Sequence, residues 1–332
     1  MKNKRVFIIK ILLITIIFIE FLFILIFFLN HLPSSALKEE ANFTQSSSID
    51  KFFEKIPGSR FHGPDGTWWG YNQNKIVRFK NIVFMYVIEN KDEKNTTLSD
   101  FVIYKKDGDK AWEKGASFPT SRPGNILIDS KGILHTFVFE PLNVLKNDSW
   151  GKLKHYWFTD AYLGDITNYK EETVVDNNGT AETVNIRIGT AIGEDDTMAI
   201  GFGLTKFNPL YNGHSEHLYF KKPSDTKWQH LVAGQNLGHD YYYPFVWVGQ
   251  NSFLLLPVQD DFADDGNPQT YDNIYQKIAY FEYKDSLWRQ DLIIDHTKHP
   301  LASTRNRIVE QEDLFVENNG TIHILYKENT DP

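Results

Sequence analysis

The feature that most constrains the fold of this chain is a hairpin pattern that recurs along it. Five segments consist of an apolar strand, a polar turn and a second apolar strand, and they begin near Lys75, Asn125, Val184, Phe245 and Asp313. Two of the turns match closely: Asp129-Ser-Lys-Gly132-Ile-Leu-His135 and Glu317-Asn-Asn-Gly320-Thr-Ile-His323. A turn glycine between two apolar runs is typical of a β-hairpin.

A second pattern lies between these hairpins: a strand that carries Tyr, a charged turn, and a Trp. It occurs at Tyr104–Trp112, Tyr219–Trp228 and Tyr283–Trp288. Successive hairpins of the first kind are roughly 50–70 residues apart, so each repeat holds about four strands. This predicts an all-β chain, a β-propeller of about five four-stranded blades or an incomplete six. A sandwich of unrelated strands is the alternative, but it does not explain why the two patterns alternate.

These residues give the chain a resemblance to the sialidase-like propellers that carry BNR (Asp-box) repeats, over roughly residues 70–330. In that superfamily an inner strand pair carries Asp-x-x-Gly-x-x-His, and an outer turn carries Asp followed by Trp. The full Asp-box spacing is not met, and Ser224–Trp228 is a shortened relative of it. The Phe/Tyr-Arg-Ile-Pro motif of true sialidases is absent. The resemblance therefore implies the propeller and a ligand site at one end of its channel, but not sialidase activity.

The N-terminus predicts a membrane signal-anchor. An apolar run extends from Val6 to Leu29 and follows the basic residues Lys2, Lys4 and Arg5. At about 1.5 Å per residue a helix of this length spans a hydrocarbon core of about 30 Å. Because the basic residues precede the run, the N-terminus is expected in the cytoplasm.

A cleaved signal peptide is the alternative, since Ser34-Ser35-Ala36 is a small-residue cleavage site. Glu20 within the run also weakens an anchor, at a cost of about 2.5–3.5 kcal/mol. We expect a cytoplasmic tip and transmembrane segment over residues 1–32, a polar tether over 33–55, and the propeller over 56–332. The expected localisation is a single-pass cell-membrane protein with the propeller outside, or a secreted protein if cleavage occurs near Ala36.

Composition excludes several kinds of function. The net charge is −8 and the sequence has no cysteine. Nucleic-acid binding needs a concentrated basic face, so nucleic acid is not an expected partner. Without cysteine there are no disulfides and no thiolate chemistry, which fits a bacterial envelope protein. We expect a monomer that binds the membrane through its N-terminal segment and a polysaccharide through its propeller.

The candidate site lies where the chain enters each innermost strand, because these loops meet at one end of a propeller channel. The entries are polar, charged or aromatic, whereas the strands after them are apolar. Candidates for substrate binding are Gln73, Lys75, Arg122, Arg305 and Arg307. Candidates for catalysis are Glu182, His239, Asp240, Tyr241 and Tyr243. Arg, Gln, His and Tyr in one cleft suit an anionic or hydroxyl-rich sugar.

Two reactions fit these residues. In a β-elimination His239 is the base, Tyr241 or Tyr243 the acid, and Arg122 or Arg305 neutralises the uronate carboxylate, as in propeller polysaccharide lyases to which the chain is similar. In a hydrolysis Glu182 and Asp240 form the carboxylate pair. The alternatives are a glycan-binding module without catalysis and an envelope scaffold, in which the Tyr run is a packed wall.

No cofactor is expected. The acidic run from Asp260 to Asp265 could hold a structural Ca²⁺, because it offers several carboxylates and a following Gly. It lacks the downstream Glu of an EF-hand, and a solvated acidic loop explains it as well. His135 and His323 follow the turn glycine by three residues in equivalent repeats, which indicates structural repeat positions.

Overall fold

The structure is a computed structural model that describes residues 74–92, 95–120, 124–142, 151–176, 182–184, 188–208, 211–236, 241–262, 274–295 and 309–328. All of them belong to one compact unit, Ile56–Pro332. Within these residues no helix is both long and apolar enough to cross a bilayer. The predicted signal-anchor, the cleavage site and the tether lie outside the described residues, so they stay predictions.

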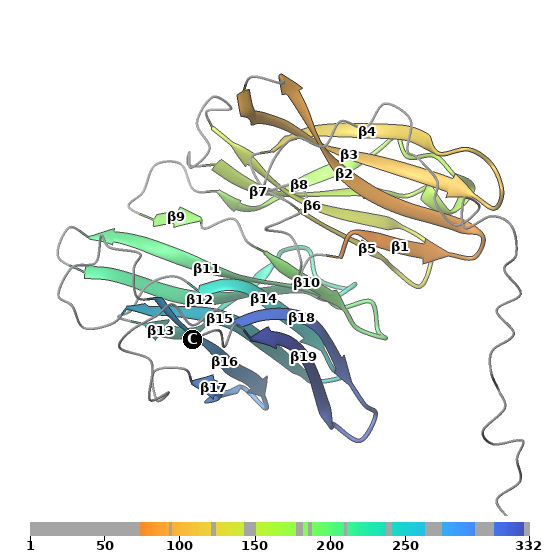
Figure 1. Ribbon diagram of the computed structural model, residues 1–332. Coiled ribbons are helices and arrows are strands. Elements are labelled where there is room, and N and C mark those ends of the chain that lie inside the picture. The colour runs from red at the N-terminus through yellow and green to blue at the C-terminus, as the bar shows by residue number, and fades with distance from the viewer. Residues whose placement is uncertain are drawn as a thin grey trace, which may run out of the picture. The chain divides into compact units, whose positions relative to one another are not determined.

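The first two sheets are four-stranded antiparallel meanders, in which each strand pairs with the next one along the chain (Figure 1). The strands of sheet 1 are β1 (Ile76–Phe79), β2 (Ile82–Asp92), β3 (Asn95–Asp107) and β4 (Glu113–Thr120). Those of sheet 2 are β5 (Asn125–Ile128), β6 (Leu134–Pro141), β7 (Gly151–Phe158) and β8 (Lys170–Asp176). A single 3₁₀ turn, η3 (Ala161–Leu163), lies between β7 and β8.

The third and fourth sheets repeat this order. Sheet 3 consists of β10 (Gly189–Ile192), β11 (Met198–Asn208), β12 (Tyr211–Lys221) and β13 (Gln229–Asn236), with the short β9 (Glu182–Val184) pairing with β11 as well. Sheet 4 consists of β14 (Tyr241–Val248), β15 (Ser252–Phe262), β16 (Ile274–Lys284) and β17 (Leu287–Asp295). Among the described residues sheet 5 has two strands, β18 (Val309–Val316) and β19 (Ile322–Glu328).

The two turns that match in sequence also match in structure. In each turn the glycine has a left-handed backbone, with φ of 83° at Gly132 and 87° at Gly320. The amide of Gly132 donates to the carbonyl of Asp129, and the amide of Gly320 donates to the carbonyl of Glu317. A residue without a Cβ adopts this conformation at little cost, which is why the sequence carries Gly at both places.

The core consists of layers between successive sheets. Phe84 and Phe101 of sheet 1 pack with Leu134 and Phe158 of sheet 2. A second cluster joins sheet 2 to sheet 3, and a third joins sheet 3 to sheet 4. Sheets 1, 2 and 3 therefore each bury apolar side chains against the next sheet along the chain, which is how consecutive blades pack.

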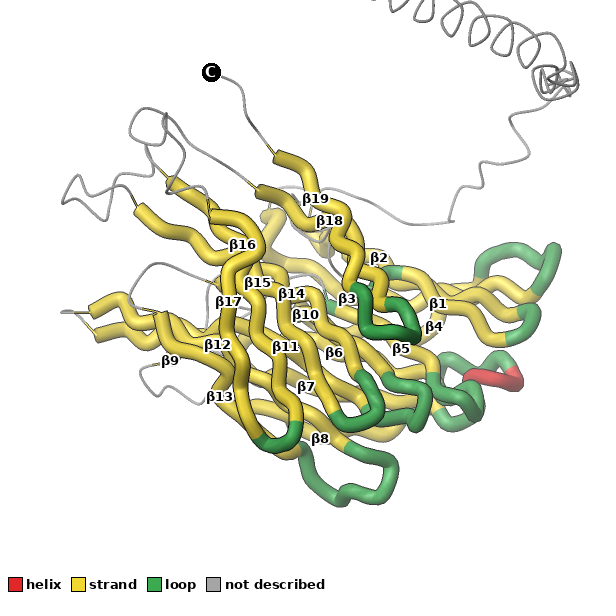
Figure 2. Tube along the Cα trace, turned by 90° about the horizontal axis from the view of Figure 1, so that it is seen from below, coloured by secondary structure: helices red, strands yellow, loops and turns green. Residues whose placement is uncertain are grey.

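The first strands of the sheets lie next to one another in chain order. β5 contacts both β1 and β10, and β14 contacts both β10 and β18. Figure 2 shows β5, β10 and β14 in this order. The backbones of β10 and β14 approach so closely that a Cβ on Gly189 would collide with the carbonyl of Pro244. Only glycine allows this approach.

The side chain of Asn125 connects three of these sheets. Asn125 begins β5 and is fully buried. Its Oδ1 accepts a hydrogen bond from the amide of Asn74 at 2.9 Å, and its Nδ2 donates to the carbonyl of Ile188 at 3.0 Å. The side chain of Asn74 donates in turn to the carbonyl of Thr190 at 3.0 Å. The starts of the first strands of sheets 1, 2 and 3 are thereby fixed to one another.

The predicted strand pattern is confirmed for all five repeats. Each inner hairpin and each Tyr–Trp element occupies a strand pair, and the described part of the fifth repeat has its inner hairpin alone. β9 is an addition that the repeats did not predict, because residues 182–184 pair along the same edge of β11 as β10 does.

We expect Asn125→Ala to lower the free energy of unfolding by about 2–4 kcal/mol, because it leaves the partly buried amide of Asn74 and the buried carbonyl of Ile188 without partners. Asn168→Ala is the matched control, since Asn168 is exposed and donates only to Asp165; it should cost less than about 1 kcal/mol. Urea denaturation measures both. Equal losses in the two variants would contradict the role of Asn125.

Candidate functional site

The starts of the first strands of sheets 1 to 4 lie at one end of the sheets, which we call the entry end and define by Asn74, Asn125, Ile188 and Pro244. These residues mark the starts of the first strands of sheets 1 to 4, and they are connected by the hydrogen bonds of Asn125 and Asn74 and by the close approach of Gly189 to Pro244. Lys75 lies here half-buried, and its burial lowers the pKa of its ammonium group.

Six of the ten predicted site residues lie outside the described part of the chain. The residues outside the described part of the chain are Gln73, Arg122, His239, Asp240, Arg305 and Arg307. Glu182 begins β9, and Tyr241 and Tyr243 lie at the start of β14; the structure describes these three as strand backbone. The roles proposed for all of them stay predictions.

The acidic run is only partly a loop. β15 continues to Phe262, so Asp260 and Asp261 are strand residues opposite Gln276 and Tyr275 of β16. The rest of the run lies outside the described residues. Within the part of the chain that is described, no three His, Asp or Glu side chains are placed to share a metal ion. The calcium site stays a prediction.

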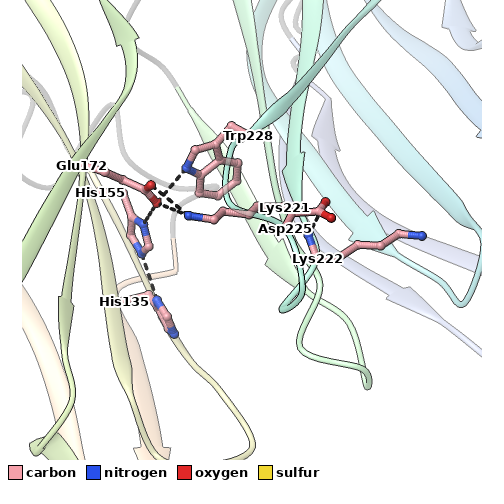
Figure 3. Close-up of polar contacts among 7 residues, drawn as sticks. All are labelled: His135, His155, Glu172, Lys221, Lys222, Asp225 and Trp228. Carbon is pink, nitrogen blue, oxygen red and sulfur yellow. Dashed lines mark hydrogen bonds and ion pairs between the residues drawn. The ribbon is translucent and has the colours of Figure 1, made fainter.

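A group of polar side chains that sequence reasoning missed lies between sheets 2 and 3 (Figure 3). Glu172 of β8 stands at its centre and accepts hydrogen bonds from three groups. His155 Nδ1 is 2.9 Å away, Trp228 Nε1 is 3.0 Å away, and Lys221 Nζ is 2.8 Å from each carboxylate oxygen. Glu172 and His155 belong to sheet 2, whereas Lys221 ends β12 of sheet 3 and Trp228 directly precedes β13, so the carboxylate joins the two sheets.

The pair His155–His135 extends this group along sheet 2. His155 Nε2 lies 2.9 Å from His135 Nδ1, and His135 Nε2 lies 3.8 Å from Asp129 Oδ2. Oδ1 of Asp129 accepts the backbone amides of Lys131 and Ile133, which fixes the carboxylate in the turn. The sequence placed Asp129 and His135 in one repeat motif, and the same contact recurs between Glu317 and His323 at 2.7 Å.

Burial and hydrogen bonding set the protonation states. Burial lowers the pKa of His155 to about 4, since its ring is packed against Phe137 and the Trp228 edge. Burial alone would raise the pKa of Glu172, but the hydrogen bonds from His155, Lys221 and Trp228 outweigh it and lower that pKa to about 2. Near neutral pH Glu172 is therefore ionised and His155 is neutral.

The hydrogen-bond directions follow from these states. An ionised carboxylate only accepts, so His155 Nδ1 carries the proton and donates to Glu172. The neutral His155 ring then has an acceptor at Nε2, and His135 Nδ1 must donate to it.

These side chains open onto a cavity of about 290 Å³, which we call the sheet 2–3 cleft. Its lining includes Asp129, His135, Trp157, Glu172, Lys131 and Lys222. Asp196 also lines the cleft, and its carboxylate accepts hydrogen bonds from the amide and hydroxyl of Ser130, at 2.8 and 2.6 Å, which connect the first turns of sheets 2 and 3. The cleft therefore lies at the end of the sheets opposite to the entry end.

Comparison with known proteins gives structural neighbours only. No protein-family model and no curated protein sequence matches the chain. An α-L-arabinofuranosidase from Fusarium graminearum, solved with an iminosugar inhibitor, is 10% identical, with 81% of this chain and 71% of that chain covered and a TM-score of 0.47. A thermostable family-43 glycoside hydrolase is 12% identical, with 82% and 88% covered and a TM-score of 0.40.

A Bombyx mori family-32 β-fructofuranosidase is 9% identical, with 66% and 47% covered and a TM-score of 0.43. These three neighbours are glycoside hydrolases and none of them is a sialidase, so the sialidase-like resemblance stays a prediction. Each TM-score lies below 0.5.

The pKa of His155 predicts a specific pH dependence. Its folded pKa of about 4 lies below the usual value near 6.5, so the unfolded chain binds more protons between these two pH values. Stability contributed by neutral His155 is complete above about pH 6.5 and falls as the pH drops toward 4, by at most about 3 kcal/mol.

We expect His155→Gln to lose less stability than the unchanged chain over this pH range, although it is the less stable protein at pH 7. Denaturant unfolding at several pH values measures the two slopes. Parallel curves for the two proteins would show that His155 is not held neutral by burial.

Proposed function

We propose that the chain is an extracytoplasmic β-propeller that binds polysaccharide at its entry end. The observation that supports this most is the Asn125 connection, which fixes the starts of three first strands together. The polar entry residues precede these starts directly in the sequence. A shared position for the starts supports a common site in which Gln73, Lys75 and Arg122 bind one glycan.

The chemistry that we propose at this site is β-elimination or hydrolysis. Gly189 and Pro244 hold the starts of β10 and β14 against each other, and Glu182 and Tyr241 belong to the segments that lead into this contact. In an elimination His239 removes the proton next to the uronate carboxylate, Tyr241 or Tyr243 protonates the leaving oxygen, and Arg122 or Arg305 neutralises the carboxylate. In a hydrolysis Glu182 and Asp240 take the acid and base roles.

Membrane attachment through residues 6–29 completes the proposal, with a tether of about 20 residues that keeps the propeller near the cell surface. The apolar length of the segment and the basic residues before it support this attachment. Fractionation separates the two N-terminal alternatives, because an anchored chain stays with the membrane and a chain cleaved near Ala36 does not.

An envelope scaffold is the second candidate. It is favoured by exposed apolar side chains on the outer strand of sheet 4 and on sheet 5, where Leu287, Phe315 and Leu325 are 73%, 63% and 63% exposed. Apolar groups on an outer surface are typical of protein-binding surfaces when they form one patch.

The test uses the full-length chain in detergent and a panel of uronate-containing and neutral polysaccharides. Retention on immobilised polysaccharide measures binding, and the absorbance of the unsaturated product detects elimination. We expect Arg122→Ala to weaken binding by about tenfold, as the loss of a charge-assisted hydrogen bond would do. Arg289→Ala is the matched control, because Arg289 is an exposed arginine on β17 and should bind normally.

Retention without product would support the glycan-binding form of the proposal. Two results would contradict it: no retention on any member of the panel, or equal weakening by Arg122→Ala and Arg289→Ala. The first of these results would favour the scaffold.

A further inference from the structure

We propose that residues 58–72 form the outer hairpin of sheet 5, so that this sheet is built from one segment before sheet 1 and one after sheet 4. The two strands of the hairpin continue the sheet from the edge of β19 and lead directly into β1. The segment lies outside the described residues, but it belongs to the same compact unit, which begins at Ile56. The proposal stands whether or not the entry end binds polysaccharide.

Sheet 5 has an open edge in the described part of the chain. β19 pairs with β18 on one side, and no described strand pairs with it on the other side. In each of the other sheets the second strand lies between two neighbouring strands. An open edge leaves a row of amide and carbonyl groups unpaired, and natural proteins usually cover such an edge. We therefore expect β19 to have a second partner strand.

One face of sheet 5 is also uncovered. Aligning the two matching turns places Phe315 at the position of Leu127 and Leu325 at the position of Phe137. Leu127 and Phe137 are 4% and 0% exposed, and they pack against sheet 3, the next sheet along the chain. Phe315 and Leu325 are each 63% exposed. The face of sheet 5 that corresponds to a packed face in sheet 2 therefore lacks a following sheet among the described residues.

The sequence before β1 carries the outer pattern that the described part of repeat 5 lacks. Residues 61–69 read Phe-His-Gly-Pro-Asp-Gly-Thr-Trp-Trp, so Phe61 takes the place of the Tyr, Asp65-Gly66 forms the turn and Trp68 follows it. Pro-Asp-Gly between two strands is a turn signal. In repeat 1 the same dipeptide, Asp107-Gly108, lies at the turn from β3 to β4, where the glycine has a left-handed φ of 56°. The segment therefore has the sequence of an outer hairpin.

The length of the connection to β1 fits an outer hairpin as well. Four residues, 121–124, separate β4 from β5, and another four, 237–240, separate β13 from β14. A strand that follows the Asp65-Gly66 turn and reaches Tyr71 leaves residues 72–75 before β1. The hairpin then enters sheet 1 as the outer strands of sheets 1 and 3 enter the next sheet, which makes sheet 1 the sheet that follows sheet 5.

This arrangement has two consequences for the surface of the propeller. Sheet 1 covers Phe315 and Leu325, which removes two of the three exposed side chains that favour an envelope scaffold. The entry of repeat 5, with Arg305 and Arg307, comes next to the entry of repeat 1, with Gln73. Five entries then share one end of the sheets.

The register of the other sheets predicts which residues of the two segments lie opposite each other. The Tyr of the outer pattern pairs with the second, third or fourth residue of the preceding strand, which is Phe253 in β15, Ile200 in β11 and Met85 in β2. Applied to β19, this register places Phe61 opposite residue 323, 324 or 325. Arg60 then lies opposite residue 324, 325 or 326.

The experiment is disulfide cross-linking of the full-length chain in detergent, since the natural sequence has no cysteine. Three double variants combine Arg60→Cys with Ile324→Cys, Leu325→Cys or Tyr326→Cys. A disulfide needs Cα atoms about 4.4–6.8 Å apart, a separation that residues directly opposite each other on neighbouring strands have. After mild oxidation we expect one of the three variants to form a disulfide within one chain, detected by non-reducing electrophoresis and peptide mass spectrometry.

The matched control combines Arg60→Cys with Leu163→Cys. Leu163 is 71% exposed, which is similar to Leu325, but it lies between β7 and β8 of sheet 2. We expect the control to form at least about tenfold less internal disulfide than the best of the three variants, because its cysteines are too far apart.

Amide hydrogen exchange is the second measurement. A strand that is paired on both sides exchanges slowly, whereas an open edge exchanges quickly. Arg60→Pro removes an amide donor and restricts the backbone of the proposed hairpin, so exchange over residues 322–328 should become at least about tenfold faster. Ser47→Pro, in the predicted tether, is the matched control and should leave this exchange unchanged.

The proposal is overturned if none of the three cysteine pairs joins within one chain, or if Arg60→Pro leaves the exchange of β19 as it was. Disulfide-linked dimers without an internal disulfide would also overturn it, because they would place a second copy of the chain on this edge.

Discussion

The fully buried amide of Asn125 is the interaction on which the arrangement of the sheets depends. It accepts from sheet 1 and donates to sheet 3 while its own backbone belongs to sheet 2. Apolar layers between sheets tolerate small sliding movements, because contacts of this kind have no direction. Two hydrogen bonds from one side chain have direction, so they fix the positions of three first strands relative to one another along the strand direction. The candidate site at the entry end exists only if the starts of these strands lie side by side.

At the opposite end, sheets 2 and 3 are connected through ionised carboxylates rather than through a side-chain amide. Glu172 with Lys221 and Trp228, and Ser130 with Asp196, connect sheets 2 and 3 near their first turns. The two kinds of contact have different structural roles. The amide at the entry end positions the strands, whereas the ionised group at the turn end also orients His155 and His135. The same network that joins the two sheets also lines the sheet 2–3 cleft.

The strands could be predicted because their signals are local. A period of two in apolar residues, a turn glycine and a Trp after a charged turn are visible in the sequence of each repeat. The partners of Asn125 and Glu172 come from different sheets, and only the packing of those sheets brings them together. The environment of Glu216 was not predictable from local sequence either. Glu216 is fully buried on β12, and neither of its carboxylate oxygens has a hydrogen-bond partner within the described residues. Burial raises its pKa well above the ordinary value. Gly203 and Gly234 lie opposite it on the neighbouring strands, a pairing that no local pattern indicates.

The most direct test of the shared entry end is a set of spin-label distances, which the absence of cysteine in the natural sequence makes simple. Single cysteines are introduced in pairs at Gln73, Arg122 and His239, labelled, and measured by EPR. Packed sheets are about 10 Å apart, so labels at these entries should lie about 10–20 Å from one another. A pair separated by about 35 Å or more, which is the length of the 11-residue strand β11, would place its members at opposite ends of the sheets and contradict a common site.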